Sequence, residues 1–305
     1  DDINTKGLVT YDRKVRKDAY YFYKANWTQA PMVYITGRRY VDRAYRVTPV
    51  RVYSNTPSTE LFVNGKSMGL LENCPNRVCE WPRVKLNKGS NEIVAHGLVE
   101  ERVVKDSLEW SLGKDASSSV RIDSGALLAG DAGERKFGSD TYFTGGTSGT
   151  LDTQPHYGQL PRFPKVEGTE DRDIVASYRE GTFSYRIPLD NGHYKLTLTF
   201  MEPDAKEGER VFDIFVGDDQ IISGLDIVKE AGATVTALTR EARVHSNNGE
   251  LLVRFVPQIG DAIVSAIEIS KFRKDMFCKR LNTFFMFFSF YRRVNCCFFD
   301  FIFCT

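Results

Sequence analysis

The sequence predicts an all-β protein of two sandwiches, an immunoglobulin-like one followed by a jelly-roll-like one, with a single helix ahead of them. Three observations lead to this fold class. Short runs rich in β-branched and aromatic residues recur about every 8–12 residues, as in β-sandwiches. Turn signals such as Asn64-Gly65 separate these runs. Helical periodicity is nearly absent from the second predicted sandwich, and 305 residues suffice for roughly two domains.

The stretch RKVRKDAYYFYKANW predicts the helix, because its part from Lys17 to Trp27 contains no proline or glycine. On a helix one face carries, at a spacing of roughly three to four residues, Ala19, Phe22, Tyr23 and Trp27. Such an aromatic face has to be buried. Either it packs on a later part of the chain, or its partner lies outside this chain.

The predicted immunoglobulin-like sandwich spans 28–114. Its clearest hairpin is TELFVNGKSMG, where Asn64-Gly65 suits a type I′ turn with two positive φ angles. Leu61 and Val63 then share one face of the strand, and Phe62 points the other way. The stretch VKLNKGSNEIVAHGL repeats the plan of strand, turn and strand.

The predicted jelly-roll-like sandwich spans 115–271 and follows the linker-like stretch GKDASSS. Its strands alternate polar and apolar residues between turns at 190–192, 217–219 and 248–249. Two segments are expected to be loops: the glycine-rich FTGGTSGT and the stretch from Val228 to Ala233.

The last 34 residues, 272–305, do not fit this plan. They hold 11 of the 21 phenylalanines and four of the six cysteines, without glycine, proline or clean alternation. Two interpretations are open: a membrane-surface anchor, or a run-on translation that is not native structure. We favour the second, and clustered phenylalanine of this kind is prone to aggregate.

Charge and cysteine content exclude several classes of protein. Without the tail the chain carries 35 basic and 38 acidic residues and no basic stripe, so nucleic acid is not an expected partner. No run reaches the ~20 apolar residues of a transmembrane helix. Cys74 and Cys79 form either a disulfide or two free thiols. No spacing of cysteine and histidine suggests zinc, and we predict neither a metal site nor a cofactor.

The sequence does not predict catalytic residues. Glu202, Asp204 and Glu207 lie together in MEPDAKEG, which we interpret as a solvated loop. The four histidines are scattered and none pairs with a serine or cysteine in a recognisable setting. Retaining glycosidases need two carboxylates roughly 5–5.5 Å apart, and no such pair is indicated.

Residues 6–112 resemble the end of the catalytic barrel and the following immunoglobulin-like domain of bacterial β-galactosidases of glycoside hydrolase family 2. The matching stretches are KGLVTYDRKVRKDAYYFYKANW, PMVYITGRRYVDR, VRVYSNTPSTELFVNGKSMG and NEIVAHG. The resemblance implies that 1–27 is a remnant of the last barrel helix. It also implies that the missing barrel is the partner of Phe22, Tyr23 and Trp27, and that the catalytic pair lies outside this chain.

Residues 118–270 resemble malectin and malectin-like carbohydrate-binding domains, through RIDSG, DTYFTGG, SYREGTFSYRIPL, GHYKLTLTFME, RVFDIFV and GDAIVSAIEI. In that family, tyrosines, a phenylalanine and an aspartate on loops at one end of the sandwich bind sugar. The resemblance implies carbohydrate binding by Tyr178, Asp261, Tyr142 and Phe143. The loop MEPDAKEGE lacks the aromatic pair that malectin has there, so malectin's own ligand preference does not carry over.

These observations leave three hypotheses. The first is a noncatalytic carbohydrate-binding fragment of a family 2 glycosidase that acts in polysaccharide breakdown, with an oligosaccharide or polysaccharide as partner. In the second, the malectin-like module is only a structural spacer or an oligomer contact. In the third, the chain is itself a glycosidase, as the family resemblance suggests. The resemblance also implies a periplasmic or extracellular location, although no signal peptide opens this chain.

Overall fold

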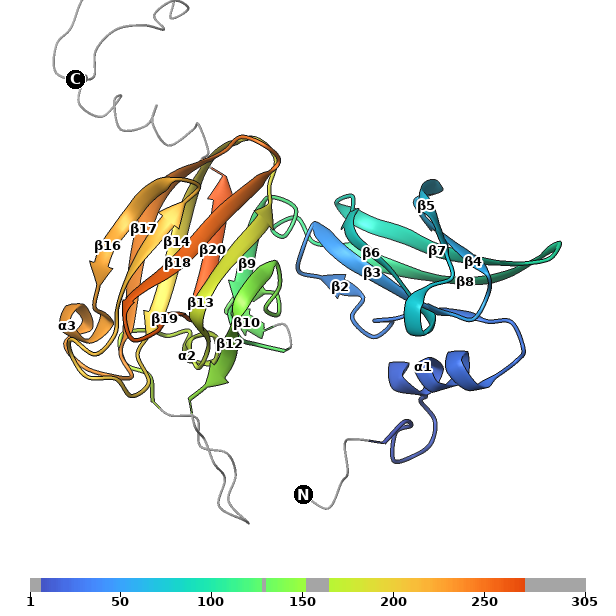
Figure 1. Ribbon diagram of the computed structural model, residues 1–305, viewed down its shortest axis with the longest axis horizontal. Helices are drawn as coiled ribbons and strands as arrows, with labels where there is room; N and C mark the ends of the chain where they lie inside the picture. The colour runs from blue at the N-terminus through green and yellow to red at the C-terminus, as the bar shows by residue number, and fades with distance from the viewer. Residues whose placement is uncertain (1–6, 128–129, 152–164, 272–305) are drawn as a thin grey trace, which may run out of the picture. The chain divides into compact units, whose positions relative to one another are not determined.

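A computed structural model describes residues 7–127, 130–151 and 165–271 (Figure 1). The interpretation of the tail at 272–305 therefore lies outside the described residues. The predicted all-β class is confirmed: strands dominate the described ranges. The helical elements are α1 (Asp18–Trp27), the 3₁₀ turn η1 (Pro75–Arg77), α2 (Arg172–Val175) and α3 (Ile227–Ala231).

Helix α1 is confirmed within one residue of its predicted start, but it buries a different face. Its buried residue is Ala25, and the Tyr21 ring stacks on the Tyr34 ring with centroids 3.6 Å apart. Tyr23 and Trp27 remain 39% and 75% exposed, so of the two alternatives for this face, packing on a later part of the chain does not occur at these two residues. The sheet beneath the helix presents tyrosines, and stacking on them turns the helix away from the predicted face.

The first sandwich pairs a three-stranded sheet, in the order β1-β3-β6, with a five-stranded sheet, in the order β2-β8-β7-β4-β5. The first sheet consists of β1 (Val33–Ile35), β3 (Val47–Ser54) and β6 (Val78–Lys85). The second consists of β2 (Asp42–Arg43), β4 (Ser58–Val63), β5 (Lys66–Glu72), β7 (Gly89–Val99) and β8 (Arg102–Leu112).

The hairpin between β4 and β5 confirms the clearest local prediction. Asn64 and Gly65 have φ angles of 51° and 77°, which is the left-handed pair that a type I′ turn requires. Leu61 and Val63 are buried in the core of the first sandwich, while Phe62 lies against the His96 ring on the other face. Alternation along the strand therefore fixes its register.

Cys74 and Cys79 form a disulfide, so the structure selects one of the two alternatives for this pair. The bond links the segment before η1 to β6, and Cys79 is part of the buried core of the first sandwich.

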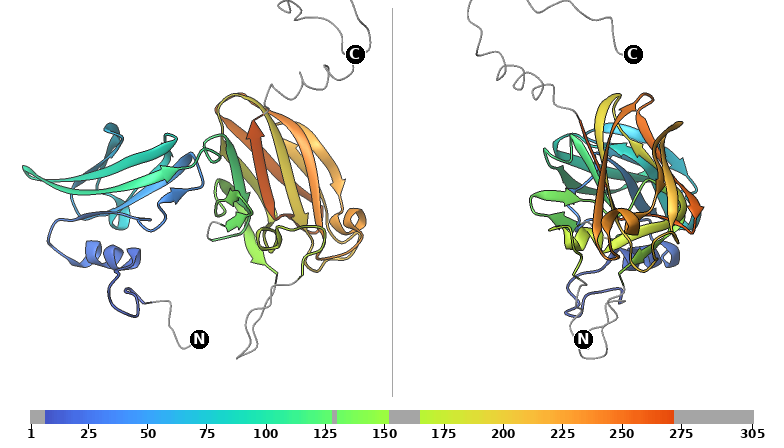
Figure 2. Two further views of the ribbon diagram at one scale, coloured as in Figure 1. Left: turned by 180° about the vertical axis from the view of Figure 1, so that it is seen from behind. Right: turned by 90° about the vertical axis from the view of Figure 1, so that its left-hand side faces the viewer.

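The second sandwich consists of two antiparallel sheets, seen from two further sides in Figure 2. The first runs in the order β12-β13-β18-β15-β16 and the second in the order β17-β14-β20-β9. The first sheet contains β12 (Phe143–Thr150), β13 (Ser177–Pro188), β15 (Val211–Val216), β16 (Asp219–Leu225) and β18 (Glu250–Ile259), and β19 (Ala262–Val264) pairs with β13. The second contains β9 (Ser119–Asp123), β14 (Gly192–Met201), β17 (Ala237–Ser246) and β20 (Ala266–Lys271). A separate ribbon joins β10 (Gly130–Ala132) to β11 (Arg135–Phe137).

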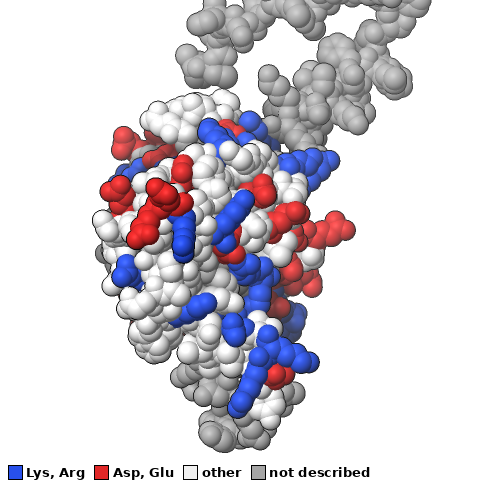
Figure 3. Space-filling view, turned by 90° about the vertical axis from the view of Figure 1, so that its right-hand side faces the viewer, with Lys and Arg blue, Asp and Glu red and all other residues white. Residues whose placement is uncertain are grey.

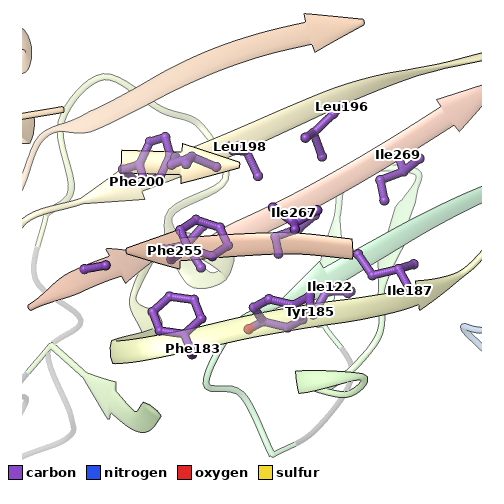
Figure 4. Close-up of a cluster of buried hydrophobic side chains, with 14 of the residues drawn as sticks. Ile122, Phe183, Tyr185, Ile187, Leu196, Leu198, Phe200, Phe255, Ile267 and Ile269 are labelled. Carbon is purple, nitrogen blue, oxygen red and sulfur yellow. The ribbon is translucent and has the colours of Figure 1, made fainter. Parts of the chain in front are cut away.

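The core of the second sandwich lies between its two sheets (Figure 4). One sheet contributes alternate residues such as Phe183, Tyr185 and Phe255, and the other contributes residues such as Leu196 and Ile267. The alternation predicted from sequence therefore places one face of each sheet in the core and leaves the other face to solvent or to flanking segments.

The turns predicted at 190–192, 217–219 and 248–249 are confirmed. The turn at 217–219 joins the paired strands β15 and β16, whereas the other two connect strands of different sheets, β13 to β14 and β17 to β18. Two predicted loops were wrong. Residues 227–231 form α3, because the Asp226 carboxylate accepts a hydrogen bond from the Lys229 amide and Gly232, with φ 86°, ends the helix. FTGGTSGT is strand β12, because Gly146 fits where an added Cβ would lie 2.6 Å from the Glu180 carbonyl of β13.

Candidate functional site

Strand β13 carries Tyr178, the first of the predicted sugar-binding residues. Tyr178 lies opposite Gly149 of β12, and an added Cβ at Gly149 would lie 2.3 Å from the Tyr178 ring. Only glycine allows the ring to sit against the neighbouring strand here. The Tyr178 side chain is half-buried, with its inner side packed on Val175 and Met201 and its remainder exposed.

Arg210, at the start of β15, joins the elements around Tyr178. Its guanidinium contacts Glu202 (Nε to Oε2, 2.7 Å) and Glu180 (Nη2 to Oε2, 3.5 Å). Its Nη1 also donates a hydrogen bond to the backbone carbonyl of Asp261, at 3.1 Å. The Arg210 side chain is only 11% exposed, so these contacts fix its position. Arg210 thereby links three loops and strands at one end of the sandwich.

Glu202 is the unexpected member of this group. Its carboxylate is only 1% exposed and accepts hydrogen bonds from the amides of Asp204 and Ala205. Burial raises the pKa of Glu202, and these amides together with the Arg210 guanidinium oppose that rise. The prediction of a solvated loop was therefore wrong for Glu202. No pattern in the sequence indicated this burial, because the cationic partner of Glu202, Arg210, follows eight residues later, beyond a loop.

Burial and nearby charges together determine the ionisation of the Tyr178 phenol. Burial, and next the carboxylates of Glu180 and Asp204, raise the pKa of Tyr178. The phenol therefore stays protonated at neutral pH and can donate a hydrogen bond. Asp261 is exposed beside this group, since its own backbone carbonyl accepts from Arg210. We call Tyr178, Glu180, Arg210 and Asp261 the Arg210 site.

The other two predicted residues lie further along β12 and β13. Phe143 is opposite Tyr185, six residues from Gly149, which is roughly 20 Å along a strand at about 3.3 Å per residue. The Arg179 guanidinium lies 3.4 Å above the Phe143 ring and occupies one of its faces. Arg210 therefore lies near Tyr178 and holds the Asp261 carbonyl, although the β13–β19 register places Asp261 four residues along β13 from Tyr178, and Phe143 lies apart from both.

Tyr142 is packed rather than presented. Its ring meets the Tyr45 ring edge-on at 5.3 Å, and its hydroxyl donates to the Val47 carbonyl. Burial raises the pKa of the Tyr142 phenol. Sugar binding by Tyr142 and Phe143 stays a prediction, and these contacts weigh against it.

The described residues contain neither a cluster of metal ligands nor a membrane-spanning helix. Among residues 7–127, 130–151 and 165–271, no three His, Cys, Asp or Glu side chains gather as metal ligands. No helix within these ranges is long and apolar enough to cross a bilayer. On the face drawn in Figure 3, basic and acidic side chains are interspersed.

The second sandwich defines a jelly roll of the kind that malectin domains form. The family model described as Malectin domain matches residues 118–272, about half of the chain. A second model, Domain of unknown function (DUF4982), matches residues 46–104 in the first sandwich. The chain belongs to the malectin domain family, as the sequence motifs predicted.

Curated relatives connect the chain to glycosidases. A Bacteroides fragilis protein named Beta-glucuronidase is 48% identical over 92 residues, which is 30% of this chain and 13% of the relative. A Formosa agariphila protein named Putative beta-glucuronidase is 27% identical over 244 residues, 76% of this chain and 20% of the relative. The chain thus spans 13 to 20% of the length of these relatives. The predicted resemblance to family 2 glycosidases is confirmed, whereas β-galactosidase specificity stays a prediction.

Two solved structures with partial similarity to the chain are the following. A Bacteroides uniformis β-glucuronidase covers 89% of this chain with 34% of its own length, at 21% identity and a TM-score of 0.45. The ectodomain of Arabidopsis thaliana ANX1 covers 81% of this chain and 82% of its own, at 12% identity and a TM-score of 0.44.

Proposed function

We propose that the second sandwich is a noncatalytic carbohydrate-binding module that holds an oligosaccharide or polysaccharide at the Arg210 site. The position of Arg210 in a malectin domain carries this proposal, because its guanidinium acts on Tyr178 and donates to the carbonyl of Asp261. These two residues lie 83 positions apart in the sequence.

The chemistry of the Arg210 site suits a sugar. A pyranose offers an apolar C–H face to an aromatic ring and a rim of hydroxyls to polar groups. The exposed part of Tyr178 supplies the ring and a protonated hydroxyl, while Glu180 and Asp261 supply carboxylate acceptors. With a single half-buried ring, the site gains little buried area, so we expect dissociation constants in the range of about 0.1–10 mM.

We further propose that the module acts in polysaccharide breakdown together with the catalytic barrel of a family 2 glycosidase. The relatives named as β-glucuronidases support this setting. The Cys74–Cys79 disulfide supports an oxidising compartment, such as the periplasm or the extracellular space.

We also propose that α1 docks on this barrel through Tyr23 and Trp27. Their rings lie 4.9 Å apart and form an exposed aromatic pair, while Phe22 on the same helix packs against Tyr53. Exposed aromatic pairs of this kind mark contact surfaces. Adding a separately produced family 2 barrel should shift the Trp27 fluorescence to shorter wavelength, and an unchanged spectrum argues against docking.

Calorimetric titration of the full chain with neutral and acidic tetrasaccharides tests the proposed binding. Tyr178→Ala should abolish the heat of binding at the Arg210 site when measured well below its melting temperature, which should fall because the ring is half-buried. Tyr11→Ala is the control, because Tyr11 is 91% exposed and lies outside the second sandwich. Absence of binding by any sugar would favour the spacer hypothesis, and hydrolysis of a chromogenic glycoside by the pure chain would contradict a noncatalytic role.

A further inference from the structure

The outer face of the sheet β17-β14-β20-β9 contains a cavity of about 340 Å³ that shares no lining residue with the Arg210 site. These four strands lie side by side in Figure 1, and their inner faces form the core. Strand β11 and the segment leading into α2 contribute one wall of the cavity. A face that would otherwise be flat is therefore enclosed on one side.

The cavity contains one small apolar corner. Phe137, Ile174 and Ala266 line it and belong to one buried cluster that joins β11, α2 and β20, but they are only 1%, 2% and 4% exposed and therefore close the wall without offering a ligand an apolar surface. The adjoining floor consists of threonines: Thr199 and Thr239 face each other directly across two strands, and Thr197 follows on the same face. Within the described ranges, the hydroxyls of these three threonines contact no other polar side chain, so they are available to a ligand.

Charged side chains around the floor are fixed by one another. Glu268 accepts hydrogen bonds from Arg121 and from Arg135, both at 2.9 Å, and Arg135 also pairs with Asp171. Their mutual contacts hold them in place before any ligand arrives, which lowers the entropic cost of binding.

The charges of the lining residues balance. The cavity is lined by three cations, Arg121, Arg135 and Lys195, and by three acids, Asp171, Glu241 and Glu268. Lys195 pairs with Glu241 at 2.5 Å, so each cation already has an acidic partner. An ionic ligand would have to break one of these ion pairs and leave one of its two side chains without a partner. A neutral ligand with many hydroxyls can instead hydrogen-bond to both members of a pair. A volume at the lower end of the range for small-molecule sites suits one or two sugar units.

We propose that this cavity is a second carbohydrate site, selective for neutral sugar units, in which the three threonines and Glu268 bind the sugar hydroxyls. This second site goes beyond the proposed function, because the cavity lies on a different sheet and involves neither Tyr178 nor Asp261.

Amide NMR of the full chain, titrated with maltotetraose, cellotetraose and xylotetraose, tests the second site. At least one neutral tetrasaccharide should shift the amides of Thr197, Thr199 and Glu268, and tetragalacturonate should bind at this face at least about tenfold more weakly. Thr197→Val with Thr199→Val removes two hydroxyls and keeps the β-propensity, so affinity at this face should fall about tenfold with an unchanged melting temperature. Thr144→Val, on an exposed position of β12, is the control and should change nothing.

One variant and the unmodified chain together separate this proposal from the proposed function. In Tyr178→Ala the shifts at Thr197 and Thr199 should persist, although binding at the Arg210 site is lost. Shifts confined to Tyr178 and Asp261 in the unmodified chain would overturn the second site and leave the first intact. Absence of any shift at this face with all three neutral sugars, or tighter binding of tetragalacturonate there, would also overturn it.

Discussion

A buried carboxyl makes the stability of the second sandwich depend on pH. Asp123, at the end of β9, is 5% exposed and accepts a hydrogen bond from the Ser177 hydroxyl, and no Lys, Arg or His among the described residues forms an ion pair with it. Burial raises the pKa of Asp123 from 3.8 to about 7, and the nearby carboxylates of Asp140 and Asp173 add to the rise, against the effect of Ser177. The folded state therefore favours the protonated acid.

The sign of the effect follows from proton binding. Because the folded pKa of Asp123 lies above its unfolded value, the native chain holds more protons than the unfolded chain between about pH 4 and pH 7. This contribution to stability is fully present below pH 3.8 and is lost as pH rises through about 7. A pKa difference of about three units corresponds to about 4 kcal/mol, at about 1.36 kcal/mol per unit.

Urea denaturation at pH 5 and pH 8 measures this loss. Asp123→Asn keeps an oxygen that can accept from Ser177 and removes the ionisable group. Between pH 5 and pH 8 the free energy of unfolding of Asp123→Asn should therefore fall less than that of the unmodified chain. The two decreases should differ by up to about 3 kcal/mol. Groups that do not interact with Asp123 titrate equally in both proteins and cancel in the comparison, whereas the nearby Asp140 and Asp173 contribute to the difference. Equal pH dependence in the two proteins would refute the reasoning.

Three further outcomes concern stability and the Arg210 site. Arg210→Met should lower the free energy of unfolding by about 3 kcal/mol in urea titrations, because Glu202 loses its cation, and adding Glu202→Gln should restore part of it. Replacing Cys74 and Cys79 by serine should cost roughly 2 kcal/mol, and a reductant should then have no further effect on melting. Gly149→Ala should displace the ring of the neighbouring tyrosine, costing about 1–3 kcal/mol and lowering sugar affinity in calorimetry; unchanged affinity would argue against that ring as the sugar platform.

Local rules of sequence predicted most of the fold. The Asn64-Gly65 pair fixed a hairpin because few residues adopt two positive φ angles in succession. The α3 segment escaped prediction because five residues are too short for a visible period, although Asp226 and Gly232 mark its ends. Strand β12 was not predicted because its glycines suggest a flexible loop when the sequence is read alone. In the structure these glycines allow the close approach of β12 to β13.

The site was less predictable than the fold, because it depends on pairs that are distant in the sequence. Family motifs indicated Tyr178 and Asp261, and pairing of β13 with β19 places both on neighbouring segments around Arg210, four residues apart along β13. No local pattern indicated Arg210 or Glu202, since an ion pair across a loop leaves no period. Tyr142 and Phe143 were also indicated by a family motif, DTYFTGG. They lie at the start of β12, however, roughly 20 Å along the strands from Tyr178.

Two weak sites on one module would together favour long sugar chains over short ones. A polymer held at the Arg210 site presents its next units to the second site at an effective concentration of about 1–10 mM, for a short flexible connection. If the second site has a dissociation constant of about 1 mM, the gain in affinity over a tetrasaccharide is about two- to tenfold. Affinity electrophoresis with a soluble neutral polysaccharide measures the gain. Either Tyr178→Ala or the paired change of Thr197 and Thr199 to valine should remove it, and a gain that survives both changes would show that the polymer binds elsewhere.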